Sequence, residues 1–473
     1  MIGPLLLAIL TPIVGSLLLP LAGKMAKRLR NILALLLVLT AFVCSASLLP
    51  AALAGTPVSI QFTVPLGLSF GFLADSLAVF IALIASFVGA VIVFYSMAYI
   101  DTGMHNSEYY LMVTLFIGAM MGLVYSTNLI FMYIFWEVSA ISCWRLIGYY
   151  REPENIFRAD KAFLITVFGA LVMLLGFTVI YQQTGTFNII EMKGAEIGNL
   201  AVALILVGIF SKSATLPLHT WLPDAGVAPA PVTSLLHAAV LVKIGIYAYA
   251  RLFIFSFVIP DIWYTVVPII AAISALVSAG AALRENDLKR IIAYSTVSQI
   301  AFIFLGLSTG NELATAGGLL YIMMHSLAKG GLFLCAGIVE HNTHTKDIRQ
   351  LGGLIKTMPI TAVSFLICAF SVMGLPPLGG FFSKYMVISG AVQAENPWVA
   401  AVFILGTLMT FLYLLRAFNA VFMGPIKLEV REGSRMMVAS VVALAVLSVV
   451  GGLLIFIPSY FVQNIVAQIG WLF

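Results

Sequence analysis

The chain has 473 residues, of which 62% are hydrophobic and only 9% are charged, and its mean hydropathy is +1.09. Soluble domains carry about 25% charged residues, so the composition excludes a soluble protein and predicts an all-α polytopic membrane protein. The net charge of +5 comes from basic residues that do not cluster on one surface, which argues against a nucleic-acid or acidic ligand. The four cysteines are far apart and show no Cys/His ligand spacing, so we expect no metal, iron–sulfur or other cofactor and no disulfide.

Apolar stretches long enough to cross a bilayer, about 20 residues each, recur along the whole chain. The first is a full-length span without a cleavage site, so we expect no removable signal peptide. The pattern predicts fourteen transmembrane helices, at residues 2–22, 31–53, 73–98, 108–126, 128–148, 161–182, 198–216, 231–255, 262–283, 290–309, 312–338, 358–392, 397–423 and 436–460.

The basic residues divide unevenly between the two sides that this arrangement creates. Seventeen of the 24 fall in loops on one side, around residues 24–30, 145–161, 284–290, 346–356 and 427–435. Only Lys193 and Arg251 fall on the other side. Because cytoplasmic loops are enriched in Lys and Arg, we expect the basic loops in the cytoplasm. The protein would then be a multi-pass protein of the cell inner (plasma) membrane with both termini extracytoplasmic.

Two of the predicted spans are interrupted by proline. Residues 212–231 contain prolines at 217, 223, 229 and 231, and residues 374–380 contain Pro376 and Pro377 beside three glycines. Proline removes an amide donor and breaks the helix, and paired broken helices in corresponding halves are typical of transport paths built on inverted repeats. The breaks lie in spans 7 and 12, five spans apart, so two five-helix units would have opposite topology. We therefore expect an N-terminal three-helix segment (1–107), two five-helix repeats (108–255 and 256–423) and a C-terminal helix (424–473).

Charged residues also occur inside the apolar stretches, namely Glu137, Lys212, Lys243, Lys329 and Lys384. A charge at the bilayer centre costs about 2.5–3.5 kcal/mol on insertion scales, so such residues are rare and usually mark an ion or proton path. The other interpretations are a buried salt bridge that joins two helices and a lysine that snorkels to the interface.

Two histidines accompany these lysines. His237 precedes Lys243 by six residues, about 9 Å along a helix and on a different face, so water would have to link the two side chains. His325 and Lys329 are four residues apart, on one helical face, and suit a proton relay because histidine titrates near neutral pH. A hydrogen-bonded core histidine is the alternative for His237, and helix packing is the alternative for the second pair.

Five segments together carry a family resemblance, which covers about residues 70–425. They are FWEVSAIS (135–142), FSKSATLPLHTWLPDAGVAPAPVTSLLHAAVLVKIGIY (210–247), LKRIIAYSTVSQIAF (288–302), MHSLAKGGLF (324–333) and GLPPLGGFFSKY (374–385). In sequence and order they resemble the antiporter-like, proton-translocating subunits shared by respiratory complex I, Mrp cation/proton antiporters and group 4 membrane-bound hydrogenases.

The resemblance implies a fourteen-helix fold with inverted repeats and a polar axis halfway across the membrane. It implies that Glu137 pairs with Lys212 and that the proton path continues through the remaining residues, with Lys384 as the terminal proton-loading site. The path then comprises Glu137, Lys212, His237, Lys243, His325, Lys329 and Lys384. The chain ends soon after its fourteenth span and has a lysine at 384 where M-type complex I subunits carry glutamate, so it resembles Mrp D-type, N-type complex I or hydrogenase-type subunits. The segment GLPPLGGFFSKY favours the Mrp D-type or hydrogenase-type subunits among these.

The expected function is that of a proton-translocating subunit in a larger membrane complex. Its partners would be other antiporter-like and small hydrophobic subunits, with or without a hydrogenase or dehydrogenase module. The sequence leaves open whether Na⁺ is carried as well as H⁺. The alternatives are a quinone- or redox-associated core subunit and a free-standing cation/proton antiporter, although no catalytic redox or hydrolytic motif occurs.

Weaker candidates lie beside this path. Asp75 would cap a helix or contact a partner subunit, and Arg416 would hold a backbone carbonyl. His219, Trp221 and Asp224 would fix the shape of the proline-rich break. Glu340, His341 and His344 have metal-like spacing but fall in a loop without further ligands, so we predict no metal site there.

Overall fold

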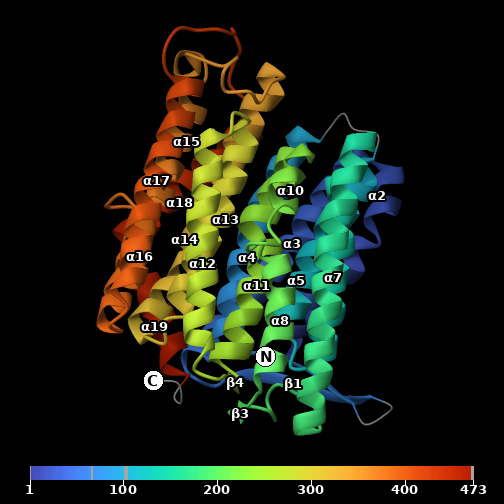
Figure 1. The fold of residues 1–473 in the computed structure, drawn as a ribbon. Helices are drawn as coiled ribbons and strands as arrows, with labels where there is room; N and C mark the ends of the chain where they lie inside the picture. Colours follow the sequence, from blue (N-terminus) through green and yellow to red (C-terminus); the bar gives the residue numbers. More distant parts are fainter. Residues whose placement is uncertain (1, 65–67, 101–104, 470–473) are drawn as a thin grey trace.

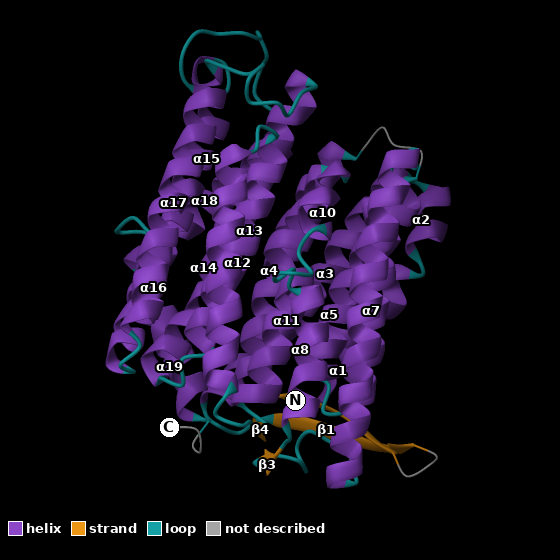
Figure 2. Ribbon diagram, in the orientation of Figure 1, coloured by secondary structure: helices purple, strands orange, loops and turns teal. Residues whose placement is uncertain are grey.

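The computed structural model describes residues 2–64, 68–100 and 105–469. Its helices run roughly parallel to one another in a single bundle, and the short strands lie together at its lower end (Figures 1 and 2). The described chain begins and ends near this same lower end (Figure 1). Residues 1 and 470–473, which include both predicted extracytoplasmic termini, lie outside the described residues, as do residues 65–67 and 101–104.

The first half of the chain forms the right-hand part of the bundle in Figure 1. Its helices before the first proline-rich break are α1 (Ile2–Ser16), α2 (Leu19–Met25), α3 (Lys27–Leu53), α4 (Ser76–Tyr99), α5 (Asn106–Tyr125), α6 (Leu129–Ile147), α7 (Pro153–Thr184) and α8 (Asn199–Lys212). After the break come α9 (Trp221–Asp224), η2 (Ala225–Val227), α10 (Ala230–Ser234), the π-helix η3 (Leu235–Ala239), α11 (Leu241–Tyr249) and the π-helix η4 (Ala250–Ile254).

The second half of the chain contains the remaining helices. They are α12 (Trp263–Arg284), α13 (Leu288–Leu307), α14 (Glu312–Thr343), the 3₁₀ turn η5 (Leu354–Lys356), α15 (Pro359–Met373), α16 (Gly379–Gln393), α17 (Pro397–Phe422), α18 (Arg435–Leu453) and α19 (Phe456–Ala467). Helix α14 is almost entirely enclosed by the rest of the protein along its apolar length.

Eleven helices of the described chain are long and apolar enough to cross a membrane, or twelve if the bent pair α1–α2 counts as one span. The molecule is therefore a multi-pass, mostly helical membrane protein. The first predicted span is not a straight helix, because α1 and α2 meet at a bend of 52°. The last predicted span, 436–460, is also divided between two helices, since α18 stops at Leu453 and α19 begins at Phe456.

Both predicted proline breaks are present. Helix α8 stops at Lys212, and the chain reaches α9 only at Trp221. Helix α15 stops at Met373, where Gly374 adopts a left-handed conformation with φ of +85°, and α16 starts at Gly379. The breaks leave short half-helices whose free ends lie inside the protein rather than in its loops.

A β-hairpin at the lower end was not expected from the hydropathy pattern. Strands β1 (Val58–Val64) and β2 (Leu68–Ala74) pair antiparallel, and the two-residue strands β3 (Ala195–Glu196) and β4 (Phe257–Val258) pair in parallel. The predicted third span began at residue 73, but residues 73 and 74 belong to β2. Asp75 then caps α4 by accepting a hydrogen bond from the Ala78 amide at 2.9 Å, which confirms its predicted capping role.

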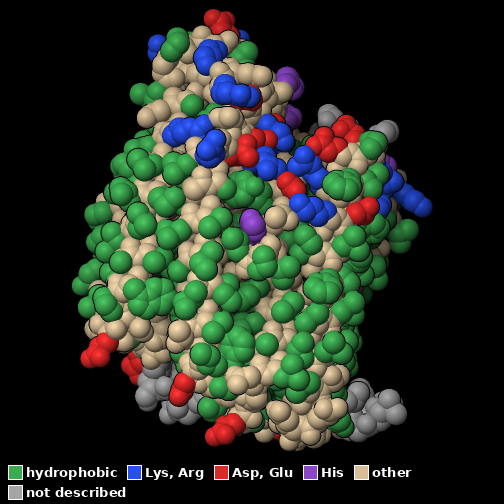
Figure 3. Space-filling view, in the orientation of Figure 1, with side chains coloured by type: hydrophobic (Ala, Val, Ile, Leu, Met, Phe, Trp, Pro, Cys, Tyr) green, Lys and Arg blue, Asp and Glu red, His purple; other side chains and the backbone are tan. Residues whose placement is uncertain are grey.

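Charge is distributed unevenly along the bundle. On the face seen in Figure 3, lysine and arginine side chains gather at the upper end, while hydrophobic side chains cover the middle and lower parts. This band of apolar surface matches the part of a membrane protein that faces hydrocarbon.

Candidate functional site

Lys212 is the last residue of α8, and its side chain is fully buried. Its ammonium donates a hydrogen bond to the Trp136 carbonyl of α6 at 3.0 Å and lies 5.3 Å from the centre of the Trp136 ring. The Trp221 indole closes the break behind it by donating to the Ser211 carbonyl at 3.0 Å. Lys212 therefore sits at the negative C-terminal end of a half-helix, a position that favours a cation.

Glu137 follows Trp136 on α6 and is half-buried. Its Oε1 atom is enclosed and has no hydrogen-bond partner among the described residues. No ion pair within 4.0 Å joins it to Lys212 in that part of the chain, so the expected contact pair is not formed here. The Lys212 ammonium bonds instead to the backbone carbonyl of Trp136, the residue before Glu137. The charges of Glu137 and Lys212 therefore interact only through space.

Lys243 connects the two halves of the site. Its ammonium donates to the His237 carbonyl at 2.9 Å and lies 2.8 Å from Nδ1 of His325 on α14. The π-helix η3 ends at Ala239, and the next residue, Val240, departs from helical geometry with φ of −125° and ψ of −70°. This irregular turn exposes the His237 carbonyl to the ammonium, since a regular helix would engage it.

The two histidines of the site differ in their contacts. Lys243 bonds directly to the backbone carbonyl of His237, and the expected water link between Lys243 and the His237 ring stays a prediction. The ring of His237 packs against Phe333, with centroids 4.3 Å apart, and neither ring nitrogen has a partner within the described chain. Nδ1 of His325 contacts Lys243, whereas Lys329, the neighbour of His325 on α14, bonds to residues of α13.

Lys329 is fully buried on α14 and points to α13. Its ammonium donates to the Ile292 carbonyl at 3.1 Å and to the Ser295 hydroxyl at 2.5 Å. It therefore begins a second polar region, separate from the Lys243–His325 contact.

Lys384 lies on α16, just after the second break. Its ammonium donates to the Met373 carbonyl, the last residue of α15, at 3.4 Å. It also lies 5.6 Å and 5.7 Å from the ring centres of Phe302 and Tyr321. Like Lys212, it combines a backbone carbonyl with an aromatic face beside a helix break.

A set of uncharged polar side chains between Lys329 and Lys384 was missed from the sequence. Tyr321, Gln299, Tyr413 and Ser295 are hydrogen-bonded in series and are all at most 1% exposed. The available signal was Gln299, an amide inside the apolar stretch 290–309, since a buried polar group needs partners.

Outside the membrane-spanning helices, Asp224 organises the upper end. It accepts hydrogen bonds from Lys161 and Arg290, each at 2.7 Å, and pairs with Arg158 at 3.4 Å. Burial alone would raise the pKa of Asp224, but the hydrogen bonds and charges of Lys161 and Arg290 outweigh it and lower the pKa below 3.8. The predicted shape-fixing role of Asp224 rests on these contacts.

The remaining weak candidates have local partners. Asp75 pairs with Arg251 through two bonds of 2.5 and 2.7 Å, and Arg416 donates to the Leu283 and Glu285 carbonyls, which confirms its predicted role. Glu340 pairs with Lys289 at 2.5 Å. No group of three potential metal ligands occurs within the residues that the structure describes.

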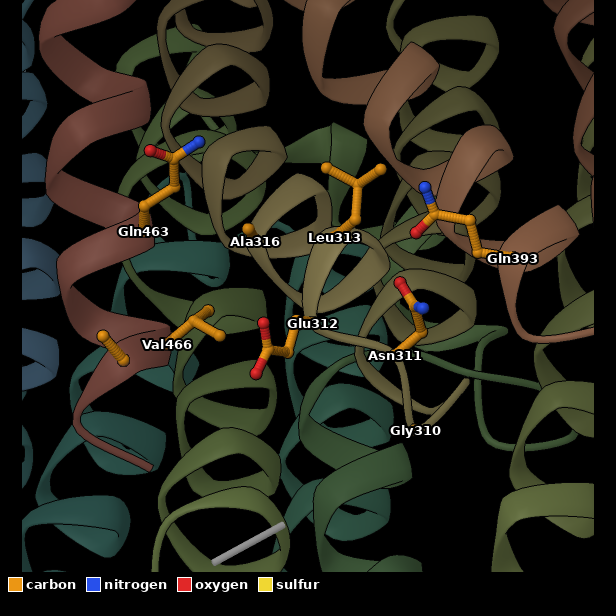
Figure 4. A pocket seen from close by; sticks show the side chains of 9 residues that line it. Gly310, Asn311, Glu312, Leu313, Ala316, Gln393, Gln463 and Val466 are labelled. Atoms are coloured by element: carbon orange, nitrogen blue, oxygen red, sulfur yellow. The ribbon is translucent and has the colours of Figure 1, made fainter. Parts of the chain in front are cut away.

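A surface cavity of about 640 Å³ opens at the lower end of the bundle, where α14 begins and α16 ends. Figure 4 shows Gln463 on one side, Gln393 on the other, and Asn311 and Glu312 between them. Lys384 precedes Gln393 by nine residues, about 13.5 Å along α16. The cavity thus lies at the far end of the helix that carries Lys384.

These features define a polytopic membrane protein with charged groups inside its helix bundle. A family model described as NADH:quinone oxidoreductase/Mrp antiporter, TM, matches residues 126–410. The chain belongs to this family, which confirms the resemblance seen in its motifs.

Curated relatives are identical to the chain at about a third of the aligned positions. They are A-type subunits of Na(+)/H(+) antiporters, one from Alkalihalophilus pseudofirmus at 34% identity and one, of the A1 type, from Staphylococcus haemolyticus at 32% identity. Each match covers 97% of this chain and 62% of the relative, so the chain spans about 62% of the length of these proteins. The narrower expectation of a D-type or hydrogenase-type subunit stays a prediction.

Solved structures show the fold. A chain of the Mrp complex from Dietzia sp. DQ12-45-1b matches with a TM-score of 0.90 at 23% identity, covering 99% of this chain and 98% of that one. A chain of the membrane-bound sulfane sulfur reductase, an archaeal respiratory membrane complex, matches with a TM-score of 0.91 at 24% identity, covering 98% and 97%.

Proposed function

We propose that this chain is a proton-translocating subunit of a multisubunit membrane complex. The observation that carries the proposal is the row of enclosed titratable groups across the bundle: Glu137, Lys212, His237, Lys243, His325, Lys329 and Lys384. Intramembrane ionisable residues are costly and mark ion pathways. The direct contact between Lys243 and His325 joins the half-helix of the first break to the helix that leads to the second.

The proposed topology has fourteen spans. Twelve apolar spans and the two short apolar helices α8 and α15, which belong to the broken spans, support this number. We place the N-terminal segment at 1–107, the inverted repeats at 108–255 and 256–423, and the last helix from 424. The basic upper end would face the cytoplasm of a cell with this protein in its plasma membrane.

The proposed partners are further membrane subunits. The curated relatives are named as subunits of Na(+)/H(+) antiporters, which favours exchange of Na⁺ for H⁺ by the assembled complex. A redox-driven complex is the second candidate, because the fold also matches a chain of a respiratory membrane complex. Purification in mild detergent distinguishes the two candidates. Hydrogenase or dehydrogenase subunits that co-purify would indicate a redox-driven complex, and only small hydrophobic subunits would indicate an antiporter.

The central test removes either charge beside the first break. Glu137→Ala or Lys212→Ala should abolish ion translocation in vesicles that contain the whole complex, while the protein still inserts and assembles. Lys193→Ala, which changes an exposed lysine outside the path, is the matched control. Transport at the control's rate in either variant would disprove the proposed path.

A further inference from the structure

Four buried, uncharged side chains join Lys329 to the surroundings of Lys384. Ser295 and Gln299 lie one turn apart on α13, Tyr413 lies on α17, and Tyr321 lies on α14. The Tyr321 hydroxyl and Gln299 Oε1 are 2.5 Å apart, and Gln299 Nε2 is 3.3 Å from the Tyr413 oxygen. Tyr413 is 2.8 Å from Ser295, which also accepts from Lys329.

The orientation of the Gln299 amide follows from its neighbours. The Thr410 hydroxyl donates to the Gly406 carbonyl at 2.7 Å, and the Tyr413 hydroxyl donates to Ser295. Both oxygens can therefore accept from Gln299 Nε2, which donates to them at 3.1 and 3.3 Å, and Tyr413 also lies 3.2 Å from Thr410. The opposite atom, Oε1, is left to accept from Tyr321.

A hydroxyl and an amide differ in what they can pass along such a chain. The oxygen of a hydroxyl both accepts and donates, so Ser295 and Tyr413 can take a proton on one side and release one on the other. The amide accepts at its oxygen and donates at its nitrogen, two separate atoms. A proton that reached Oε1 could leave toward Tyr413 only if an amide N–H bond broke.

We propose that Gln299 is an insulating link in this chain: it aligns Tyr321 and Tyr413, and protons that pass between Lys329 and Lys384 do not cross the Gln299 amide. The inference rests on the proposed function, since insulation matters only if both lysines exchange protons. Gln299 is a positioning residue, because it contacts neither lysine and acts through Tyr321 and Tyr413. It holds the Tyr321 ring under the Lys384 ammonium and blocks a direct leak along the side chains.

The test replaces the amide by groups that differ in proton transfer. In vesicles with the assembled complex, we expect Gln299→Glu to raise the passive decay of an imposed pH gradient about tenfold, or about 1.4 kcal/mol. A carboxyl group can bind a proton on one oxygen and release one from the other. Gln299→Leu should leave the passive decay unchanged and reduce coupled translocation severalfold, because it removes the alignment and adds no proton carrier.

The matched control is Ser298→Ala, one residue earlier on α13. Ser298 is fully buried, but its hydroxyl has no hydrogen-bond partner among the described residues. This variant should match the wild type in both measurements. Assembly of each variant is verified in mild detergent, and Gln299→His, whose ring nitrogens accept and donate, replaces the glutamate variant if that one does not assemble.

The inference is overturned if the pH gradient decays no faster with Gln299→Glu, or with Gln299→His in its place, than with the wild type. Equal rates of passive pH-gradient decay in the Gln299→Glu and Gln299→Leu variants would also overturn it. Water that enters the altered site, rather than the new carboxyl group, would then carry the protons. A failure of the proposed function looks different, because Lys212→Ala would then keep full transport whatever the Gln299 variants do.

Discussion

At the scale of single residues, the four buried lysines share one kind of partner. Each ammonium donates to a backbone carbonyl: Lys212 to Trp136, Lys243 to His237, Lys329 to Ile292 and Lys384 to Met373. A neutral amine keeps N–H donors, so this bond survives when the lysine releases a proton. The arrangement lets each lysine change charge without leaving a buried carbonyl unsatisfied, which would cost about 1–3 kcal/mol.

These partners could not be read from the sequence. The residue type does not indicate which backbone carbonyls a helix break or a π-turn exposes. Gln299 and Tyr413 look like ordinary polar residues in an apolar helix. The lysines, His325 and Glu137 were identifiable because charge in a span is rare. Which of them touch depends on tertiary packing, so the contact between Lys243 and His325 and the bond from Lys212 to the Trp136 carbonyl could not be predicted.

The proposed proton-releasing role of Lys243 predicts the effect of an arginine. Lys243→Arg keeps the positive charge beside His325, but an arginine cannot be deprotonated in a protein. We expect at least a ~100-fold loss of translocation, the usual contribution of a positioned proton-transfer group, with normal assembly. Lys193→Arg serves as the control, and activity of Lys243→Arg near the wild-type rate would show that the charge alone is needed.

The lowered pKa of Asp224 predicts a pH-dependent stability. Because its folded-state pKa lies below the unfolded value of 3.8, its ion pairs stabilise the protein above pH ~4, and this contribution is lost as pH falls through the folded pKa. Asp224→Asn should cost about 1–2 kcal/mol near pH 7, seen as a lower Tm in detergent. The difference from the wild type should shrink below pH 4.

Glu154→Gln is the control for that prediction, since Glu154 forms an ion pair with Arg158 but is 68% exposed. Exposed pairs contribute little, so its Tm should stay near the wild-type value. A constant difference between Asp224→Asn and the wild type at all pH values would contradict the electrostatic explanation.

At the scale of helices, the sequence predicted where spans lie and where they break. Hydropathy locates long apolar helices, and proline locates breaks, because both signals arise from local chemistry. The β1–β2 hairpin and the bend between α1 and α2 were missed, since neither changes the hydropathy of its segment strongly. Asp75 marked the start of α4 correctly, because a cap is a local signal too.

The second break depends on glycines that let backbones approach closely. A Cβ atom on Gly452 of α18 would lie 2.0 Å from the Pro377 carbonyl oxygen, and one on Gly380 would lie 1.9 Å from that of Ser371. Gly452→Ala should therefore displace the break and destabilise the protein by about 1–3 kcal/mol, the usual cost of overpacking. Coupled transport should fall with it, because Met373 holds Lys384.

Gly280→Ala on α12 is the matched control, because its Cβ would meet only the Met409 methyl group at 3.9 Å. That variant should be as stable as the wild type or slightly more stable, since alanine favours helices over glycine. Equal Tm values for the Gly452 and Gly280 variants would show that α18 yields easily and does not fix the break.

At the scale of the whole molecule, the distribution of basic residues agrees with the ribbon. Loops around residues 346–356 and 427–435 belong to the basic upper end, and the hairpin and the first and last described residues lie at the opposite end (Figures 1 and 3). Composition and loop charge were enough to predict which end of the bundle is basic, because both quantities average over many residues. The predicted internal repeats, by contrast, depend on how helices far apart in the chain are superposed.

The orientation in the membrane is the last prediction. If the basic end faces the cytoplasm, a cysteine replacing Thr345 should react with a membrane-impermeant maleimide only after intact cells are permeabilised. A cysteine replacing Lys193, an exposed residue next to β3, should react from outside. The parent for both is a variant without Cys44, because the other three native cysteines are buried. Labelling of position 345 in intact cells would show that the orientation is the opposite one, with the basic end of the bundle outside the cell. The proposed proton path would then run in the opposite direction across the membrane.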